Sequence, residues 1–415
     1  MRATIAAAIT SLLLATSLFA ADWPQWRGPT RDGVSTETGL LKEWPKEGPK
    51  LLWHAKDIGS GYSTPAVVGE RLYVISNDGM EKEYVQALNV KDASQVWSTP
   101  IGKVGPNDPG MNYPGSRSTP TVVGDTLYAL GSDGDLAAME TATGKIKWQK
   151  NLRTDFGGKP GKWAYAESPL VDGDTLVVTP GGADATIVAL NRNTGETVWK
   201  SAIPGGDEAG YASAIAVDID GAKQYVQFLQ NGLVGVDAKS GKFLWRYETT
   251  AKGSPANMST PVAHDDYIYS AATRSGGGLA KLKVAGGNVV AEEVYFSPRL
   301  PNAIGGVVRV GDHLYGAGAR SLMCIQFTTG DIKWQDRAIG AASITCADGL
   351  LFLHGEKGDV LLAEASPDAY KEKGRFSPPD QPDRGRSQAW AYPVIANGRI
   401  YIRDLTSLWC YDIKQ

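Results

Sequence analysis

The sequence predicts an all-β fold, an eight-bladed β-propeller of four-stranded antiparallel blades whose ring is closed by N- and C-terminal strands. Three observations carry this prediction: an 11-residue string with five copies, its regular spacing, and two incomplete repeats at the chain ends. With 415 residues, 42% hydrophobic and 21% charged, the chain has ordinary globular composition and ample length for a core.

The recurring string is predicted to be a β-hairpin that ends in tryptophan. Its copies are residues 87–97, 138–148, 189–199, 235–245 and 324–334. Four of the five have glycine at the seventh place, and glycine supplies the positive φ of a tight turn. The small first residue leaves room for a large ring from a neighbouring unit. We therefore interpret these tryptophans as packing between units rather than as a carbohydrate-stacking surface.

The spacing of the copies counts the blades. Upstream of each copy lies a second hairpin, such as residues 118–131, so each unit has four strands. From Trp53 to Trp334 the units recur at intervals of 39 to 51 residues, with Tyr295 in one of the tryptophan places. Repeats of this length with four strands are typical of propeller blades. Eight units are counted; seven is the alternative if the irregular unit after Trp334 is not a blade.

The two ends of the chain are predicted to complete one blade. Residues 408–415 match the start of the string without its tryptophan strand, and residues 48–55 form such a strand with none before it. Closing the ring in this way removes open sheet edges. The predicted organisation is a signal peptide at residues 1–21, an N-terminal arm at 22–47 and a single propeller at 48–415.

The first residues resemble a secretory signal peptide. Arg2 precedes an apolar run, and Ala20 and Ala21 offer small residues for cleavage. We expect cleavage and a periplasmic or secreted protein; an uncleaved membrane anchor is the alternative. No later stretch reaches 18 consecutive apolar residues, so we expect no membrane insertion. A net charge of −3 without a basic block argues against nucleic acid as a partner, and we expect a monomer.

Three long connections between units are rich in glycine and proline, namely residues 99–117, 152–167 and 376–390. Because all three enter inner strands, they predict one elaborated face around the mouth of the channel. The residues expected to point into this mouth combine both charges, amides and rings, which suits a polar, ring-containing ligand. They are Arg117, Trp163, Tyr165, Glu167, Tyr211, Asn257, Asn302, Arg386, Gln388 and Trp390. The alternative is that these groups pair with one another and with water to fill the channel.

No catalytic or metal-binding motif is found in the sequence. The three cysteines form no C-x-x-C pair, and the four histidines are scattered without ligand spacing. Cys324 and Cys410 take the small first place of the string and are expected to be buried. Trp23 and Trp26 precede the ring, and we expect them to staple the arm to the side of the propeller.

The string A-x-D-x-x-T-G-x-x-x-W resembles the tryptophan-docking motif of the pyrroloquinoline quinone (PQQ) repeat family, and the likeness runs from Trp23 to the chain end. The segments WPQWRGPTRDGVS and GYSTPAVVGERLYV are similar to the shorter PQQ-like propellers of planctomycetes and related bacteria, which are likened to BamB. The resemblance implies the propeller fold. Quinoprotein dehydrogenases of the family hold PQQ and Ca²⁺ beside a vicinal disulfide, and this chain lacks adjacent cysteines. BamB-like proteins are lipid-anchored scaffolds, and no lipid-accepting cysteine follows the apolar run here.

Two functions follow as hypotheses. The first is an exported binding or scaffolding module without a cofactor, which holds an unknown protein or a small polar ligand on the elaborated face. The second is a divergent PQQ-dependent alcohol dehydrogenase with PQQ and calcium, in which Glu167, Asn257 and Asn302 would contact metal and cofactor.

Overall fold

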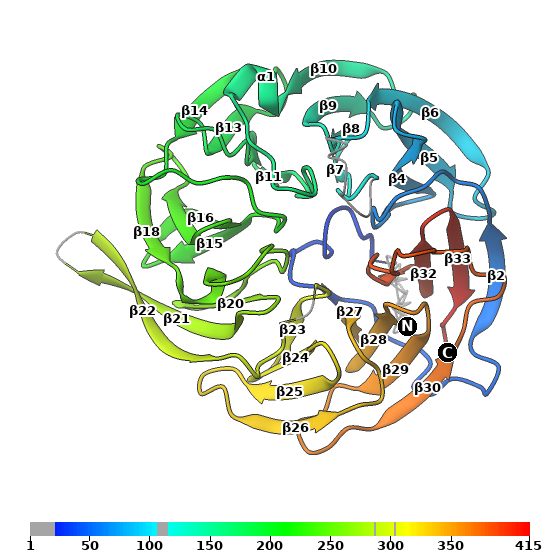
Figure 1. Ribbon diagram of the computed structural model, residues 1–415. Coiled ribbons are helices and arrows are strands. Elements are labelled where there is room, and N and C mark those ends of the chain that lie inside the picture. The colour runs from blue at the N-terminus through cyan, green and yellow to red at the C-terminus, as the bar shows by residue number, and fades with distance from the viewer. Residues whose placement is uncertain (1–20, 106–114, 286–287, 303) are drawn as a thin grey trace, which may run out of the picture.

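The computed structural model describes residues 21–105, 115–285, 288–302 and 304–415. In these residues the chain forms eight blades around a ring, as Figure 1 shows. Each blade is an antiparallel sheet of four strands. The predicted eight-bladed all-β propeller is confirmed, and the irregular unit after Trp334 is a full blade. The predicted signal peptide lies almost wholly outside the described residues.

We number the blades by the chain order of their inner strands. Blades 1 and 2 are β3 (Ala66–Val68), β4 (Arg71–Asp78), β5 (Lys82–Asn89), β6 (Gln95–Gly102), and β7 (Thr121–Val123), β8 (Thr126–Leu130), β9 (Asp135–Glu140), β10 (Ile146–Asn151). Blades 3 and 4 are β11 (Leu170–Asp172), β12 (Thr175–Val178), β13 (Ile187–Asn191), β14 (Thr197–Ser201), and β15 (Ile215–Ile219), β16 (Ala222–Leu229), β17 (Gly232–Asp237), β18 (Phe243–Tyr247).

Blades 5 and 6 are β19 (Val262–His264), β20 (Tyr267–Ala272), β21 (Gly276–Ala285), β22 (Asn288–Ser297), and β23 (Val307–Val310), β24 (His313–Ala317), β25 (Leu322–Gln326), β26 (Ile332–Asp336). Blades 7 and 8 are β27 (Ala342–Ala347), β28 (Leu350–Gly355), β29 (Val360–Glu364), β30 (Glu372–Phe376), and β31 (Val394–Ala396), β32 (Arg399–Asp404), β33 (Ser407–Asp412), β2 (Lys50–Ala55). A two-residue strand β1 (Val34–Ser35), a short helix α1 (Leu152–Phe156) and a 3₁₀ turn η1 (Thr249–Ala251) complete the described elements.

Blade 8 closes the ring with both ends of the chain. The N-terminal strand β2 pairs antiparallel with β33, and Trp53 lies opposite Cys410. The predicted closure is therefore confirmed. Cys324 and Cys410 are both buried, as predicted, and Cys346 is buried too; none of the three forms a disulfide.

Aromatic side chains of the outer strands join neighbouring blades. Trp199 of β14 donates its indole N–H to the carbonyl of Ala238 in blade 4 at 3.1 Å. Its ring lies on Gly241, where a Cβ would come within 2.4 Å of the indole. The same donation to the backbone of the next blade is made by Trp53, Trp97, Trp148, Tyr295 and Trp334.

Trp245 is the exception to this pattern. Its indole N–H donates to the side chain of Gln224, in its own blade, at 2.7 Å. The next blade carries the long β21–β22 hairpin in place of the 11-residue string with its Thr-Gly turn. Trp245 is nevertheless buried, and it packs with the cores of blades 4 and 5.

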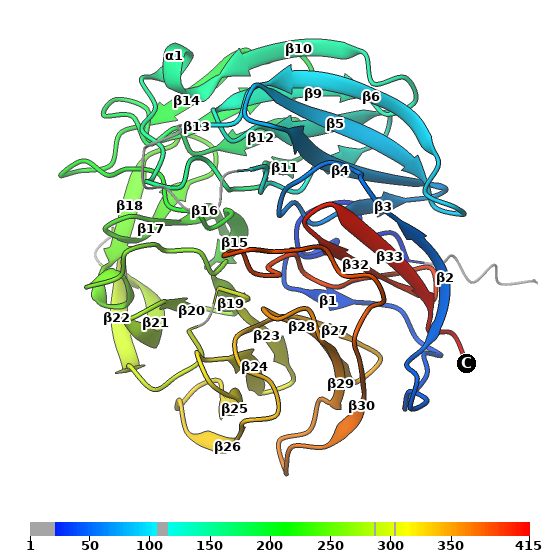
Figure 2. The same cartoon turned by 45° about the vertical axis from the view of Figure 1, so that its right-hand side comes forward.

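The N-terminal arm runs inside the ring, where Figure 1 shows the first described residues in blue. Trp23 pairs with Val67 of β3, and β1 pairs in parallel with β27, beside which it lies in Figure 2. The expectation that Trp23 and Trp26 staple the arm to the side of the propeller is wrong. Because every inner strand has a free inner edge, a segment passing through the ring can satisfy backbone groups that no blade partner reaches.

The arm makes a hydrogen bond to each of the eight blades. The residue contacted in each blade lies in the innermost strand or within two residues of it. Arg31 contributes to two of them, donating to the carbonyls of Ser168 at 2.9 Å and Ala214 at 3.0 Å. The other six contacts join Trp23 to Val67, Pro24 to Val122, Trp26 to Thr260, Arg27 to Val307, Gly33 to Cys346 and Ser35 to Ile395. Residues 23–35 therefore fill the inner end of the channel.

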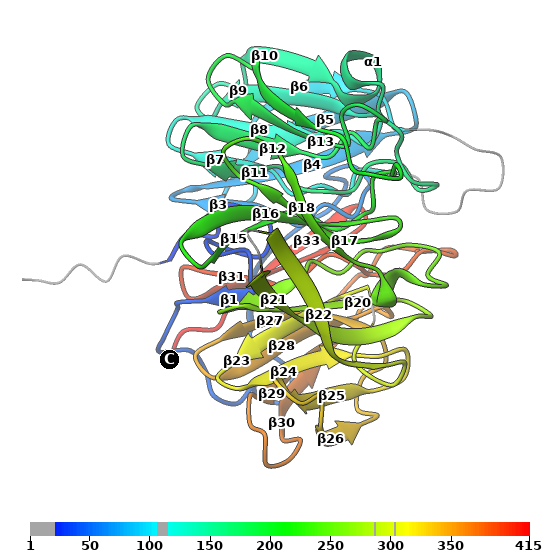
Figure 3. The ribbon, with the colours of Figure 1, turned by 90° about the vertical axis from the view of Figure 1, so that its left-hand side faces the viewer.

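The two faces of the disc differ. Figure 3 shows α1 on one side and the C-terminus on the other. We call the side that carries α1 and the connections 152–167 and 376–390 the loop-rich face. Among the described residues, no helix has the length and hydropathy needed to cross a membrane.

Candidate functional site

A cavity of about 260 Å³ lies at the centre of the loop-rich face, and we call it the cup. Its lining comes from the arm and from segments that precede the inner strands of seven blades. The lining residues are Trp26, Tyr62, Thr64, Arg117, Trp163, Ala166, Tyr211, Met258, Ile304, Trp390 and Tyr392. Six of these eleven are tryptophan or tyrosine, so the cup is chiefly aromatic.

One place in the repeat builds most of this lining. In blades 1, 2 and 5 it is the residue before Ser-Thr-Pro, which is Tyr62, Arg117 and Met258. The equivalent residues of blades 3, 4, 6 and 8 are Ala166, Tyr211, Ile304 and Trp390. In blade 7 the place falls to Ala341, which is not one of the lining residues. The ring symmetry of the fold therefore brings seven side chains, far apart in sequence, to one centre.

The arm supplies the floor of the cup. Trp26 stands edge-on to Tyr392, with ring centroids 4.7 Å apart, and donates its indole N–H to the Thr260 hydroxyl at 2.8 Å. Arg27 lies over the ring of Tyr392, with its guanidinium carbon 5.6 Å from the ring centroid. The arm bonds to the inner strands, whereas most other lining residues lie in the segments before those strands. Trp26 therefore forms the deepest part of the lining.

Two further aromatic pairs form the sides. Tyr62 lies 5.1 Å from Trp390, and Trp163 lies 5.8 Å from Tyr211 between ring centroids. Their polar atoms are engaged with protein groups: the Tyr211 hydroxyl accepts from the Trp163 backbone N–H, and Trp390 donates to Glu356 at 3.0 Å. The sides therefore present mainly ring faces and edges to the cup.

Arg117 is the one charged side chain among the described residues that line the cup. Its guanidinium lies over the ring of Tyr62, at 5.5 Å from the centroid, and donates to the carbonyl of Gly115 at 2.7 Å. Burial lowers the pKa of Arg117, while the negative charge of Glu83 is among the opposing influences. An arginine keeps its proton under all ordinary conditions, so the cup carries a positive charge.

Of the ten predicted mouth residues, four line the cup: Arg117, Trp163, Tyr211 and Trp390. Glu167 and Asn257 are buried and bonded elsewhere. Glu167 accepts hydrogen bonds from the Thr179 backbone and hydroxyl and from Gln227, and burial raises its pKa to about 7.

The remaining predicted residues also lie outside the lining. Asn257 donates its amide to the carbonyls of Leu229 and Gln230, which fixes a turn of blade 4. Tyr165 is buried and donates to the carbonyl of Pro180 at 2.8 Å. Asn302 accepts a hydrogen bond from Thr273 through its backbone carbonyl, Arg386 is exposed, and Gln388 is half-buried.

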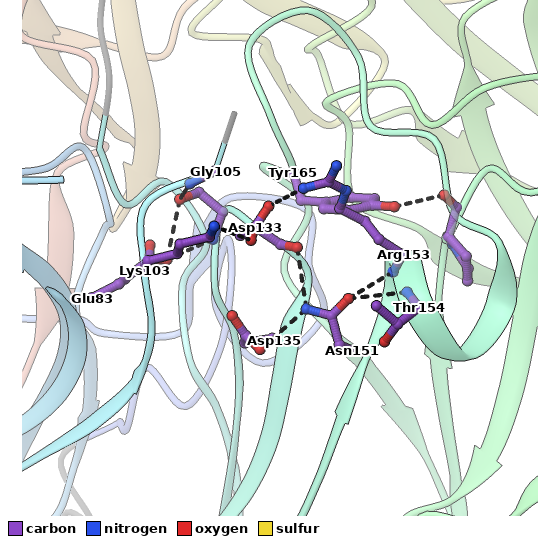
Figure 4. A network of polar contacts seen from close by, with 11 residues as sticks. Glu83, Lys103, Gly105, Asp133, Asp135, Asn151, Arg153, Thr154 and Tyr165 are labelled. Atoms are coloured by element: carbon purple, nitrogen blue, oxygen red, sulfur yellow. Dashed lines mark hydrogen bonds and ion pairs between the residues drawn. The ribbon is translucent and has the colours of Figure 1, made fainter. Parts of the chain in front are cut away.

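A polar network anchors the start of the connection after β6, as Figure 4 shows. Glu83 of β5 accepts from the Ser132 backbone N–H at 2.8 Å, and the Ser132 hydroxyl accepts from Gly105 at 2.9 Å. Burial raises the pKa of Glu83 to about 7. Residues 106–114 of this predicted loop lie outside the described residues.

The same network holds the connection after β10. Asn151 caps α1, because its side-chain oxygen accepts from the backbone N–H groups of Arg153 and Thr154 at 3.0 and 3.2 Å. Arg153 in turn pairs with Asp133 of blade 2 (Figure 4). The segment that leads to Trp163 therefore starts from a fixed helix.

Sequence reasoning missed Trp26, Tyr62, Thr64, Ala166, Met258, Ile304 and Tyr392. Aligning the Ser-Thr-Pro segments of the blades would have found Tyr62 and Met258 from Arg117. No signal in the sequence places the arm across the ring, so Trp26 was out of reach.

The described lining of the cup does not have the donor set of a calcium site. No described lining residue is aspartate or glutamate, and no cluster of three His, Cys, Asp or Glu suited to a metal occurs in the described residues. Calcium takes six to eight oxygen ligands, chiefly carboxylates and carbonyls. The described lining therefore does not supply the metal ligands of a PQQ–calcium pair of the dehydrogenase type.

The family model described as outer membrane protein assembly factor BamB matches residues 33–164 and 111–336. BamB of Burkholderia pseudomallei is 26% identical over 275 residues, which cover 57% of this chain and 69% of that protein. BamB of Yersinia pestis is 26% identical over 54% of this chain and 56% of its own length. The quinoprotein alcohol dehydrogenase PedH of Pseudomonas putida is 25% identical, over 59% of this chain and 42% of its own length.

Solved structures show the same fold. The crystal structure of BamB from Moraxella catarrhalis aligns with a TM-score of 0.62 at 15% identity, covering 88% of this chain and 99% of that one. Quinohemoprotein alcohol dehydrogenase from Comamonas testosteroni aligns with a TM-score of 0.52 at 14% identity, covering 95% of this chain and 80% of that one. The family-model matches together span residues 33–336, well over half of the sequence, and the chain therefore belongs to the PQQ-like β-propeller family described as outer membrane protein assembly factor BamB.

Proposed function

We propose that this protein is an exported binding module that works from the loop-rich face of its propeller. The signal-peptide pattern of the first 21 residues supports export, and the BamB relatives, named as outer membrane assembly factors, favour the periplasm. Membership of the family supports a propeller that binds or scaffolds.

The cup is the observation that carries this proposal. Seven blades each direct the residue at one place of the repeat to it, and the arm closes its inner end. A concave, largely aromatic pocket with one charged group has the composition of a ligand site rather than of a filled channel. The arm occupies the inner end of the ring, so the cup opens toward the loop-rich face alone.

A divergent quinone-dependent dehydrogenase is the second candidate, favoured by the similarity to PedH. The rings and Arg117 could accept a planar anion, but the carboxylates that would bind calcium are missing from the described lining. Glu167, the acid expected to serve there, has its oxygens bonded to Thr179 and Gln227. We therefore assign no reaction step to PQQ or calcium.

A pair of photo-crosslinking residues tests the binding face. One replaces Arg386, which is exposed on the connection 376–390, and the other replaces Lys239, which is exposed in the β17–β18 turn at the opposite end of blade 4. Irradiation of native cells that express each variant should give crosslinked products from position 386 and none from position 239. Products from position 239 alone would refute the proposed face.

Reconstitution separates the two candidates. The purified mature protein is mixed with PQQ and Ca²⁺, and binding is followed by calorimetry together with dye-linked oxidation of alcohols. A binding module gives no turnover above a no-enzyme blank. Saturable PQQ binding with alcohol-dependent dye reduction would overturn the module proposal in favour of the dehydrogenase.

A further inference from the structure

The size of the cup limits its ligand. Sites for drug-sized ligands measure roughly 300–1,000 Å³, and the cup, at about 260 Å³, lies just below that range. It therefore suits one ring or two fused rings better than a larger molecule. Trp26 closes the inner end, so a ligand enters from the loop-rich face and stops on the indole.

The polar atoms of the cup walls are largely committed to the protein itself. Trp26 donates to Thr260, Trp390 donates to Glu356, and Tyr392 donates to the carbonyl of Ile304 at 3.2 Å. A sugar would bury several hydroxyls against these walls, and each unbonded hydroxyl is costly. Stacking and edge-on contacts with an apolar ring meet no such cost.

The charge of the cup selects the sign of the ligand. An aromatic box without a cation would attract quaternary ammonium groups through the ring faces. Here Arg117 lies against the ring of Tyr62, and no described lining residue is acidic. Glu83, the acid whose charge acts on Arg117, lies outside the lining, and burial raises its pKa to about 7. Guanidinium groups bind carboxylates through paired, charge-assisted hydrogen bonds. The site therefore favours an anion and disfavours a cation.

We propose that the cup binds a small aromatic monocarboxylate, with its ring between Trp163 and Trp390 and its carboxylate on Arg117. The proposal rests on the proposed function, since it names the ligand class of the same cup. One positive group matches one carboxylate, and the aromatic sides match one or two rings. The ligand is thus less polar than the sequence alone indicated.

Three naphthalene compounds of equal ring size test the charge and ring requirements by calorimetry on the purified mature protein. The cup should bind 2-naphthoate with one-to-one stoichiometry, and the neutral 2-naphthamide should bind at least about tenfold more weakly. The cation 2-naphthylmethylamine should bind most weakly of the three. No saturable binding of 2-naphthoate, or tighter binding of the amine, would overturn the proposal.

Matched variants locate the carboxylate. Arg117→Gln should weaken 2-naphthoate binding by roughly 10- to 100-fold, the range for hydrogen bonds to charged groups, and should leave 2-naphthamide binding unchanged. The unchanged amide binding also shows that the variant folds. Arg386→Gln, an exposed arginine of the same face outside the cup, should leave both affinities unchanged. Equal loss in the two arginine variants, or no loss in Arg117→Gln, would refute the assignment.

A second variant tests the ring contact independently of Arg117. Trp163 is only half-buried, so Trp163→Ala should fold, and it should weaken the acid and the amide by similar factors. Unchanged binding of both would refute the ring site. If the naphthalene titrations fail while crosslinking from position 386 succeeds, the proposed binding face is supported and the ligand class is wrong. If crosslinking fails while the titrations succeed, only the macromolecular partner is refuted.

Discussion

The indole of Trp26 stands edge-on to the phenol ring of Tyr392, with 4.7 Å between their centroids. One residue belongs to the N-terminal arm and the other precedes the innermost strand of blade 8. Their contact joins the segment that fills the ring to the wall of the cup. The arm is therefore part of the fold and part of the candidate site at once.

Arg31 holds the arm in the ring. Its side chain is buried and donates to the carbonyls of Ser168, Pro169 and Ala214. Arg31→Met removes these three buried hydrogen bonds, and the free energy of unfolding in denaturant should fall by at least about 3 kcal/mol. Arg320→Met, at an exposed arginine, should change it by less than about 0.5 kcal/mol. Similar small effects of both would mean that the arm adds little stability.

The contribution of the contact between Trp199 and Gly241 to stability can be measured with a pair of glycine variants. Gly241 has φ +72° with the indole against it, whereas Gly173 has φ +57° with nothing within 4 Å of the site of a Cβ. Both alanine variants meet the left-handed cost of about 1–2 kcal/mol. Gly241→Ala should lose about 1–3 kcal/mol more in chemical denaturation, because the ring must move. Equal losses would show that the indole does not rest on this glycine.

Trp199→Ala separates packing from binding. Trp199 is nearly buried and lies outside the cup, so its truncation should lower the unfolding free energy by about 3–5 kcal/mol. Binding of 2-naphthoate, measured by calorimetry below the unfolding transition, should stay unchanged. Trp163→Ala should show the reverse, with weaker binding and a small loss of stability. Loss of binding without loss of stability in Trp199→Ala would contradict a packing role for this tryptophan.

Stability should depend on pH through Glu167. Burial raises its pKa from 4.5 to about 7, with hydrogen bonds from Thr179 and the charge of Arg31 opposing. Between these two pKa values the folded protein holds a proton that the unfolded chain releases, so this group's contribution is full at low pH and is lost as the pH rises through 7. Glu167→Gln removes the titration. The stability of the variant relative to wild type should therefore rise from pH 5 to pH 8, by up to about 1.4 kcal/mol per pH unit. A pH-independent difference would contradict the raised pKa.

The fold could be predicted because most blades repeat the same short sequence pattern. The Thr-Gly turn, the small first residue and the terminal tryptophan recur in register, so the blade count follows from the sequence. Trp245 shows the limit of this reasoning. Its own string is regular, but its contact depends on the next blade, where the longer β21–β22 hairpin replaces the 11-residue string.

The candidate site could be predicted only in part, because an error of one position along the chain changes which side chain is expected to face the cup. Glu167 follows the lining residue Ala166, and Asn257 precedes Met258. In extended backbone, neighbouring side chains point to opposite sides. Both predicted residues consequently lie within the protein. The arm was beyond prediction, since its path is set by Arg31 and by backbone groups of separate blades.

A crystal structure of the protein grown with 2-naphthoate is the most direct test of the cup as the binding site. Ring density should lie between Trp163 and Trp390, above Trp26, with the carboxylate within hydrogen-bond distance of Arg117. Residues 23–35 should cross the ring beneath the ligand. Naphthoate bound on the opposite face, or a cup filled by protein side chains while naphthoate binds elsewhere, would contradict the proposed site.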